Sequence, residues 1–223
     1  MEKRMMTFRS QSQVSVNVTF SYIVGKRLFD IACGLLGLIL VIFMCLILMP
    51  FYSFGKNRGP LFFKQIRVGQ NGKKFGIYKF RSMVVDAEEV LKKNTALYSK
   101  YLSNSYKLPA GEDPRVTKIG LFIRKTSLDE LPQFINILKG DMSMIGPRPV
   151  VEKELNEYGD RVDEFLSAKP GAMGLWQASG RSNICYPERA DLEMYYVSHR
   201  SFHYDLMILF KNIVSIVKAV GAF

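Results

Sequence analysis

An uninterrupted run of uncharged, mostly apolar residues near the N-terminus constrains this chain more than any other feature. The run covers residues 31–49 and reads IACGLLGLILVIFMCLILM. As a helix it would be about 28 Å long, close to the roughly 30 Å hydrocarbon thickness of a bilayer. The polar stretch ahead of it is long and no small-residue cleavage site follows it, which argues against a removed signal peptide. The sequence therefore predicts a membrane anchor, which we place at residues 22–55.

The charges that flank this run bear on the topology of the anchor. Lys26 and Arg27 precede it and Lys56 and Arg58 follow it, so both ends carry the basic residues typical of a cytoplasmic flank. Pro50 lies near the C-terminal end, where its ring and missing N–H would kink or stop a helix. These features predict a re-entrant helix that returns to the face it entered. Short basic flanks also occur on true spans, so a full span is the alternative.

The composition narrows the partners that the chain could have. Lys and Arg number 31 against 20 Asp and Glu, a net charge of +11. Such an excess predicts a polyanionic partner, either nucleic acid, an anionic membrane surface or a phosphorylated small molecule. The 3 cysteines are too few and too scattered for a disulfide framework or a metal site, which favours a reduced compartment. His199 and His203 lack the further ligands that a zinc site needs.

The rest of the sequence predicts a mainly helical α+β domain at residues 56–223, preceded by a flexible polar tail at residues 1–21. Alternating apolar and basic residues around Asn71-Gly72 predict a β-hairpin within residues 61–83. Glycines and prolines divide residues 113–149 into short helices, and residues 169–183 read as a loop with a short strand. Amphipathic, partly interfacial helices are expected at residues 86–102, 151–167, 187–199 and 205–220.

Two adjacent carboxylates, Asp129 and Glu130, stand in the segment RKTSLDELPQ. Either Ser127 or Asp129 could cap a helix there, and Ser127 with Glu130 has the spacing of a capping box. A capped surface helix is the structural explanation. The functional explanation is that the positive end of the helix favours anions, and that one carboxylate attacks a phosphate or holds a metal. Mg²⁺ bridging from Asp129 to a diphosphate suits these hard oxygen ligands.

Basic residues that could bind phosphate are spread along the chain. An arginine fork matches phosphate oxygens geometrically, although most single basic residues are merely solvated. Arg148 is the strongest candidate, because Pro147 and Pro149 hold it in a stiff turn after Gly146. Arg181 follows Gly180 in a glycine-containing loop near Trp176. The remaining candidates are Lys79, Arg81, Arg115, Arg124 and Lys125.

The order of these motifs resembles the bacterial sugar transferases, the polyprenyl-phosphate phosphoglycosyl transferases with a monotopic membrane anchor. The resemblance runs from about Lys26 to the C-terminus. It is carried by KRLFD, the apolar segment with its proline, YKFRSM, RKTSLDELPQFINILKGDMSMIGPRP and KPGAMGLWQASGR. The dyad together with the GDM…GPRP segment is highly specific. The chain resembles the minimal catalytic form of this family.

The resemblance implies a two-step transfer at the cytosolic face of the bacterial inner membrane. Asp129 would attack a UDP-sugar, release UMP and form a phosphosugar-aspartyl intermediate, from which undecaprenyl phosphate would take the phosphosugar. Glu130 would assist with Mg²⁺ or with proton transfer, while Arg124, Arg148 and Arg181, with Lys79 and Arg81, would bind phosphates. A re-entrant helix broken at Met49-Pro50 would be the anchor, with Ser53 or Tyr52 satisfying freed backbone groups. Anionic lipids, and a second copy of the chain in a homodimer, are further expected partners.

The sequence leaves the sugar open and admits two other functions. The loop GLWQASGRS is more similar to the enzymes for galactose or glucose than to those for acetamido sugars, and the pathway would be exopolysaccharide or capsule assembly. A non-catalytic membrane protein that binds nucleic acid or anionic lipid is one alternative, but acidic residues interrupt the basic ones and no nucleic-acid module is recognisable, so we expect no nucleic acid. A polytopic enzyme with direct transfer is the other, and it would require several spans.

Overall fold

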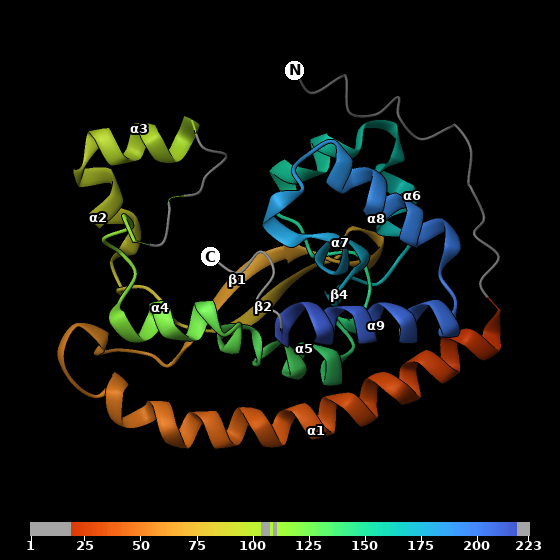
Figure 1. Ribbon diagram of the computed structural model, residues 1–223, viewed down its shortest axis with the longest axis horizontal. Helices are drawn as coiled ribbons and strands as arrows, with labels where there is room; N and C mark the ends of the chain where they lie inside the picture. The colour runs from red at the N-terminus through yellow and green to blue at the C-terminus, as the bar shows by residue number, and fades with distance from the viewer. Residues whose placement is uncertain (1–18, 104–107, 109–110, 218–223) are drawn as a thin grey trace.

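The longest element of the protein is helix α1, Phe20–Tyr52. The computed structural model describes residues 19–103, 108 and 111–217, so the predicted tail lies almost wholly outside the described residues. Figure 1 shows α1 as a single bowed helix that runs along one side of the molecule beneath the other elements. Pro50, where a break was predicted, lies inside the last turn, and the helix continues for two more residues to Tyr52. There the Ser53 hydroxyl donates to the carbonyl of Met49 at 3.1 Å, as expected.

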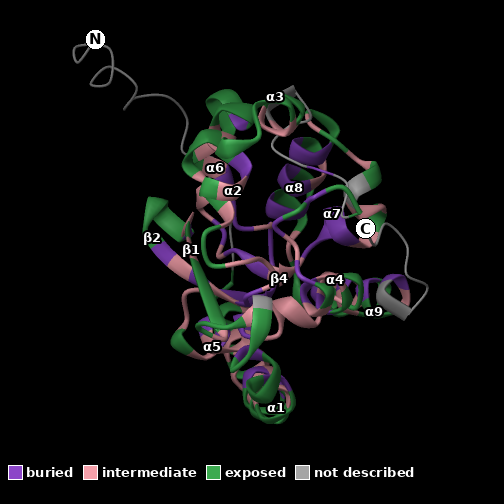
Figure 2. Ribbon diagram, turned by 90° about the vertical axis from the view of Figure 1, so that its left-hand side faces the viewer, coloured by how far each residue is buried: buried purple, intermediate pink, exposed green. Residues whose placement is uncertain are grey.

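One stripe of α1 packs against the rest of the protein and the other faces are exposed. The stripe consists of residues three, four or seven apart, the spacing of one helix face: Asp30, Gly34, Gly37, Val41, Leu48 and Tyr52. Figure 2 shows this division between buried and exposed residues. The helix is long and apolar enough to cross a membrane, and 22% of its most apolar window is buried inside the protein. A core helix would be covered on all sides, whereas the apolar faces of α1 are left exposed, as in a helix that lies in or on a membrane.

Both ends of α1 are fastened to the domain above it. Near its start, Lys26 Nζ lies 2.6 Å from an Asp205 carboxylate oxygen. The Arg27 guanidinium donates to the carbonyls of Ile137 and Leu138, in a second helix, at 2.7 and 2.8 Å. Near its end, the Tyr52 hydroxyl donates to the carbonyl of Arg81. The basic residues that precede the apolar run therefore bind the protein itself.

The predicted hairpin is confirmed. Strands β1 (Phe62–Val68) and β2 (Lys74–Phe80) pair in antiparallel register, with Gln65 opposite Ile77. The turn between them contains the short 3₁₀ helix η3 (Gln70–Gly72), in which Asn71 has φ 55° and Gly72 has φ 76°. Asn and Gly tolerate this left-handed region best, which explains why Asn71-Gly72 marks the turn.

The predicted single helix at residues 86–102 is wrong in one respect, because the structure divides it. Helices α2 (Ala87–Lys93) and α3 (Thr95–Ser103) are separated by Asn94, whose φ of −108° and ψ of 93° are extended. The Asn94 side chain then accepts a hydrogen bond from the backbone N–H of Leu97 at 3.1 Å. This is the local capping bond through which Asn competes with a continuous helix.

Residues 113–149 form short elements that lie between α1 and the upper part of the molecule (Figure 1). They are helix α4 (Lys118–Lys125), the 3₁₀ turn η4 (Leu128–Glu130), helix α5 (Gln133–Lys139) and strand β3 (Ser143–Ile145). Strand β3 pairs in parallel with β4 (Gly171–Met173), with Ser143 opposite Gly171. The short strand at residues 169–183 was expected, but its partner was not.

The C-terminal elements agree with the predicted helices except at residues 151–167. That segment is mostly the 3₁₀ helix η5 (Glu152–Arg161), broken at Gly159 with φ 52°, and only α6 (Val162–Leu166) is α-helical. Helix α8 (Glu188–His199) lies where it was expected, and α9 (Phe202–Val217) begins ahead of the predicted helix at residues 205–220, whose end lies outside the described residues. The remaining elements are η2 (Gly55–Asn57), α7 (Leu175–Ser179) and η6 (Arg181–Asn183), so the loop predicted within residues 169–183 is wrong where α7 and η6 form.

The main core joins these pieces into a mostly helical fold with small two-stranded sheets. Ile137 of α5, Ile145 of β3, Val197 of α8 and Ile208 of α9 are all fully buried in it. Burying apolar side chains from segments this distant in sequence fixes α5 and β3 between α1 and the C-terminal helices. The core thereby fixes the turn η4, which leads directly into α5.

Candidate active site

The Asp129-Glu130 dyad lies on the turn η4 between α4 and α5. Both predicted caps are wrong: Ser127 has φ 57° and makes no side-chain capping bond, and α5 begins only after Pro132. An N-cap needs extended backbone, which Ser127 in its left-handed conformation does not offer. The dyad therefore lies on its own short turn ahead of α5, and neither carboxylate belongs to that helix.

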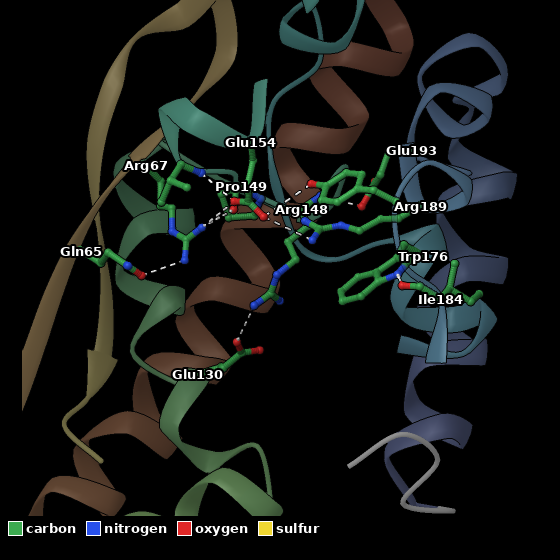
Figure 3. A network of polar contacts seen from close by, with 12 residues as sticks. Gln65, Arg67, Glu130, Arg148, Pro149, Glu154, Trp176, Ile184, Arg189 and Glu193 are labelled. Atoms are coloured by element: carbon green, nitrogen blue, oxygen red, sulfur yellow. Dashed lines mark hydrogen bonds and ion pairs between the residues drawn. The ribbon is translucent and has the colours of Figure 1, made fainter. Parts of the chain in front are cut away.

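Glu130 faces two cations from different elements. Its Oε1 lies 2.8 Å from Lys79 Nζ on β2 and 3.7 Å from a guanidinium nitrogen of Arg148. Figure 3 shows the Arg148 side chain reaching down to Glu130. Burial alone would raise the pKa of Glu130, but the charges of Lys79 and Arg148 prevail and lower it to about 2. Glu130 is therefore a permanent carboxylate at neutral pH.

Asp129 has the opposite environment. Burial raises its pKa to about 6, the charge of Lys79 opposes this, and the neighbouring carboxylate of Glu130 raises it further. Its carboxylate accepts no hydrogen bond within the part of the chain that the structure describes. An unpaired carboxylate with a raised pKa is more basic than an ordinary one and is still mostly ionised at pH 7. These are the properties of a nucleophile. Two neighbouring carboxylates whose pKa values are shifted in opposite directions can take different roles in a reaction.

The predicted turn around Arg148 is held from behind by a buried carboxyl that the sequence analysis missed. The backbone N–H of Arg148 donates to Glu193 Oε1 at 3.2 Å, and the side chain of Arg148 lies over the Trp176 ring at 5.6 Å (Figure 3). Burial raises the pKa of Glu193 to about 7. Arg189 covers the same indole at 4.5 Å. The turn is thus positioned by α7 and α8 together.

Arg67 on β1 is a second residue that sequence reasoning missed. Its guanidinium donates to Gln65 at 2.7 Å, to Glu154 at 3.3 Å and to the carbonyl of Pro149 at 3.4 Å (Figure 3). Burial and the nearby charge of Arg148 lower its pKa to about 10. Nothing in the strand pattern distinguishes Arg67 from the neighbouring basic residues, because its position depends on how the hairpin meets the turn after Gly146.

The remaining predicted cations divide into two groups. Arg124 lies close enough to Asp129, and Arg181 close enough to Glu130, for their charges to act on these carboxylates. Arg81 is not brought to the dyad: its buried guanidinium donates to the carbonyls of Asn57, Pro60 and Met83. The structure thus gathers Lys79, Arg124, Arg148 and Arg181 around the dyad and uses Arg81 to hold a loop. Arg115 is likewise paired, with Asp113 at 2.7 Å.

A small cavity of about 10 Å³, room for about one water, opens beside Glu130. Its walls come from the hairpin, α5, the turn at Arg148 and β4, and its lining residues are Arg67, Ile77, Lys79, Glu130, Gln133, Arg148, Pro149, Gly171 and Ala172. Arg67, Lys79 and Arg148 thus line one small enclosure together with the carboxylate of Glu130. Such a surplus of positive charge at short range favours an anionic ligand.

The dyad can also be tested as a magnesium site. Among the described residues, no three Asp, Glu, His or Cys side chains lie together as metal ligands. Mg²⁺ does not need such a cage, because it is usually held by one or two carboxylates together with substrate phosphates and water. The Asp129 carboxylate has no hydrogen-bond partner in the described structure and fits this role, whereas Lys79 and Arg148 occupy one oxygen of Glu130. The residues fit a magnesium ion that is shared with a diphosphate.

The fold and the site together define a class: proteins with one long apolar helix that hold a carboxylate dyad against a cluster of cations suited to an anionic ligand. Comparison with known families agrees with this class. The model of the family described as bacterial sugar transferase matches residues 21–219. The chain belongs to this family of transferases, as its motifs predicted.

The similar proteins are named for sugar transfer or for exopolysaccharide production. The undecaprenyl-phosphate galactose phosphotransferase of Salmonella typhimurium is 45% identical over 201 residues, which are 89% of this chain and 41% of that protein. Galactosyl transferase CpsE of Streptococcus agalactiae is 42% identical over 99% of this chain and 49% of its own length. The exopolysaccharide production protein ExoY of Sinorhizobium fredii is 40% identical over 90% of this chain and 88% of its own length. The chain thus spans less than half of the first two relatives and most of the third.

Proposed function

We propose that the protein transfers a hexose 1-phosphate from a UDP-sugar to undecaprenyl phosphate and releases UMP. The observation that carries this proposal is the division of the dyad, with Glu130 held by cations and Asp129 left unpaired with a raised pKa. Nothing in a capped surface helix would require that arrangement. The names of the similar proteins supply the substrates: one is an undecaprenyl-phosphate galactose phosphotransferase.

In the first half of the reaction, an Asp129 carboxylate oxygen attacks the phosphorus that carries the sugar. An oxygen–phosphorus bond to Asp129 forms, the bond to the bridging oxygen breaks, and its electron pair leaves on the phosphate of UMP. In the second half, an oxygen of undecaprenyl phosphate attacks the same phosphorus and the Asp129 carboxylate departs. A covalent intermediate divides one difficult transfer into two easier ones.

The cations around the dyad bind and orient the phosphates in both halves. Lys79, Arg124 and Arg148 lie on the Asp129 side, and Arg181 reaches Glu130 from the loop after α7. Fixed donors aimed at developing negative charge are usually the largest electrostatic contribution to such a reaction. Mg²⁺, when bound by the dyad with the diphosphate, would neutralise further charge there. Glu130 stays ionised, so we assign it to holding these cations and not to carrying a proton.

The location of the site follows from α1. Both ends of this helix bind the same charged domain, through Lys26 and Arg27 at one end and Tyr52 at the other. A charged domain cannot lie in hydrocarbon, so both ends belong on one face of the membrane. We infer a re-entrant or in-plane anchor with the catalytic domain on the cytosolic face, where soluble UDP-sugar and membrane-bound acceptor meet. The net charge of +11 suits anionic lipid headgroups there.

The activity is tested by measuring UMP release from purified protein with undecaprenyl phosphate and a panel of UDP-galactose, UDP-glucose and UDP-N-acetylglucosamine. We expect galactose or glucose to be transferred, because of the loop at residues 174–182 and the galactose named in two similar proteins. Asp129→Asn is the matched control and should release no UMP above background. Absence of UMP release with every donor, combined with salt-sensitive binding to DNA or anionic vesicles, would favour the non-catalytic alternative.

A further inference from the structure

An exposed apolar stripe runs along α9, a helix that the proposed mechanism does not use. Its members are three or four residues apart, the spacing of one helix face, and are 41 to 69% exposed: Phe202, Leu206, Phe210 and Ile213. The Phe202 ring packs edge-on against Phe29 of α1, with ring centroids 5.9 Å apart. Figure 1 shows α9 between α1 and α7. The stripe on α9 therefore continues the exposed apolar surface of α1 into the catalytic domain.

A groove of about 320 Å³ lies between α9 and α7, at the C-terminal end of this stripe. Residues 178–180 form one wall, and the other wall consists of Phe210, Lys211, Val214 and Ser215. The buried amide of Asn212 fixes the two helices together, because it donates to the carbonyl of Gly174 at 3.1 Å. The lining is mostly apolar, and the volume is within the range of small-ligand pockets. Since Phe210 belongs to both, the stripe leads directly into the groove.

The α7 side of the groove leads to the active site. Its wall ends at Gly180, and the next residue is Arg181, which lies close enough to Glu130 for their charges to interact. Lys211 adds a second cation in the opposite wall, and no Asp or Glu is among the described residues that line the groove. The order from α1 to the dyad is thus an apolar stripe, an apolar groove and a cation. A ligand that fits this order has an apolar chain with an anionic end.

The proposed reaction contains one molecule of that kind. A UDP-sugar has no long apolar part, whereas undecaprenyl phosphate carries its phosphate at the end of an isoprenoid chain. We propose that the groove between α7 and α9 binds the isoprene units next to the phosphate of the lipid acceptor. This inference rests on the proposed function, which supplies the acceptor. A phospholipid chain in the groove would instead block the way from the stripe to Arg181.

The groove would lower the cost of bringing the acceptor to Asp129. The phosphate must leave the level of the lipid headgroups to reach the dyad, and the first isoprene units must follow it. Apolar groups drawn out of hydrocarbon into water lose the free energy of their burial. Contact with Phe210 and Val214 keeps these units out of water, while the rest of the chain lies along the stripe and in the bilayer.

The test fills the groove with a larger side chain. Val214→Trp places an indole in the groove, and Ile213→Trp is the matched control, because Ile213 is the neighbouring residue, is 47% exposed and does not line the groove. Thermal unfolding in the same detergent would first show that both variants are folded. The KM values for undecaprenyl phosphate and for the UDP-sugar would then be measured, together with covalent labelling by a radiolabelled UDP-sugar without acceptor.

We expect Val214→Trp to raise the KM for undecaprenyl phosphate at least about 10-fold, which corresponds to the lost burial of about two methylene groups. Its KM for the UDP-sugar and its covalent labelling should equal those of the wild type, and Ile213→Trp should match the wild type in all three measurements. An unchanged KM for the acceptor in Val214→Trp, or an equal rise in both variants, would overturn the assignment.

A second measurement uses the wild type and does not depend on how a variant folds. An isoprenyl phosphate with a photoreactive diazirine beside the phosphate should cross-link to residues 178–180 or 210–215, as mapped by mass spectrometry. Undecaprenyl phosphate should compete with this cross-linking and phosphatidylglycerol should not. Cross-links confined to other segments, or equal competition by phosphatidylglycerol, would overturn the assignment. Either result would leave UMP release by the wild type intact, so the proposed function would survive it.

Discussion

Asp129 and Glu130 are adjacent in sequence but opposite in their effect on stability. Burial raises the pKa of Asp129 to about 6, so its ionisation above that pH destabilises the folded state. The cations lower the pKa of Glu130 to about 2, so its charge stabilises the fold above the unfolded value near 4.5, and this contribution is lost as the pH falls towards 2. Removing the charge of Asp129 should therefore stabilise the folded protein, and removing the charge of Glu130 should destabilise it.

We predict that Asp129→Asn raises the melting temperature at pH 7.5 and that Glu130→Gln lowers it, each by a few degrees, at about 2–4 °C per kcal/mol. The gain in Asp129→Asn should shrink as the pH falls from 7.5 to 5, because the wild-type carboxyl then becomes protonated. Thermal unfolding in detergent at both pH values measures this. Shifts of the same sign for both variants would contradict the division of the dyad.

The raised pKa of Asp129 also predicts how activity depends on pH. Only the ionised carboxylate attacks, so kcat/KM for the UDP-sugar should fall below a pKa of about 6, by roughly tenfold per pH unit. Initial rates of UMP release between pH 4.5 and 8.5 would measure this limb. Glu193→Gln is the control, because burial raises the pKa of Glu193 to about 7. If the limb vanished in that variant, it would belong to Glu193 and not to Asp129.

Some of the individual residues of the site were predicted from the sequence. Lys79, Arg124, Arg148 and Arg181 were found from motifs, and they do surround the dyad. Arg81 was grouped with them because its charge is the same. Its guanidinium is taken up by carbonyls from a loop, and such carbonyls exist as partners only once the loop has folded. Gln133 and Glu193 carry no sequence signal, because what distinguishes them is burial.

Among the elements, the contact of α1 with α5 links the membrane anchor to the active-site turn. Gly37 of α1 lies against the Phe134 ring, and a Cβ there would be 2.2 Å from its atoms. Gly37→Ala should therefore destabilise the protein, by about 1–3 kcal/mol for an overpacked site. Gly25→Ala on the same helix meets nothing within 4 Å and should be neutral or stabilising by up to about 1 kcal/mol. Thermal unfolding of the two variants measures this, and equal effects would contradict the close packing.

Elements with strong local signals were predicted well. The apolar run gave α1, the Asn71-Gly72 turn gave the hairpin, and α8 and α9 were recognised from their patterns. The pairing of β3 with β4 was not predicted, because it joins two strands of 3 residues each that are distant in sequence. The break at Asn94 was also missed, since a side-chain cap in the middle of an amphipathic pattern leaves the apolar spacing unchanged.

For the whole molecule, the topology of α1 decides where the catalytic domain lies. Cysteines introduced one at a time at Ser21 and Lys73, in a background in which Cys33, Cys45 and Cys185 are replaced by Ser, should be labelled by an impermeant maleimide only after the cells are permeabilised. Native Cys185 is exposed and marks the domain itself. Both ends of α1 bind that domain, so all three positions should behave alike. Labelling of Ser21→Cys in intact cells would show a full span and contradict a shared face.

A soluble donor and a membrane-embedded acceptor meet this protein from different phases, which is the reason to store the phosphosugar on Asp129 between them. The most direct test is to incubate the protein with a UDP-sugar radiolabelled in the sugar, without lipid acceptor. The wild type should become covalently labelled with stoichiometric release of UMP, and Asp129→Asn should stay unlabelled and turn over at less than about 0.1% of the wild-type rate. A wild type that never becomes labelled but still turns over when undecaprenyl phosphate is present would transfer directly, contradicting the covalent mechanism.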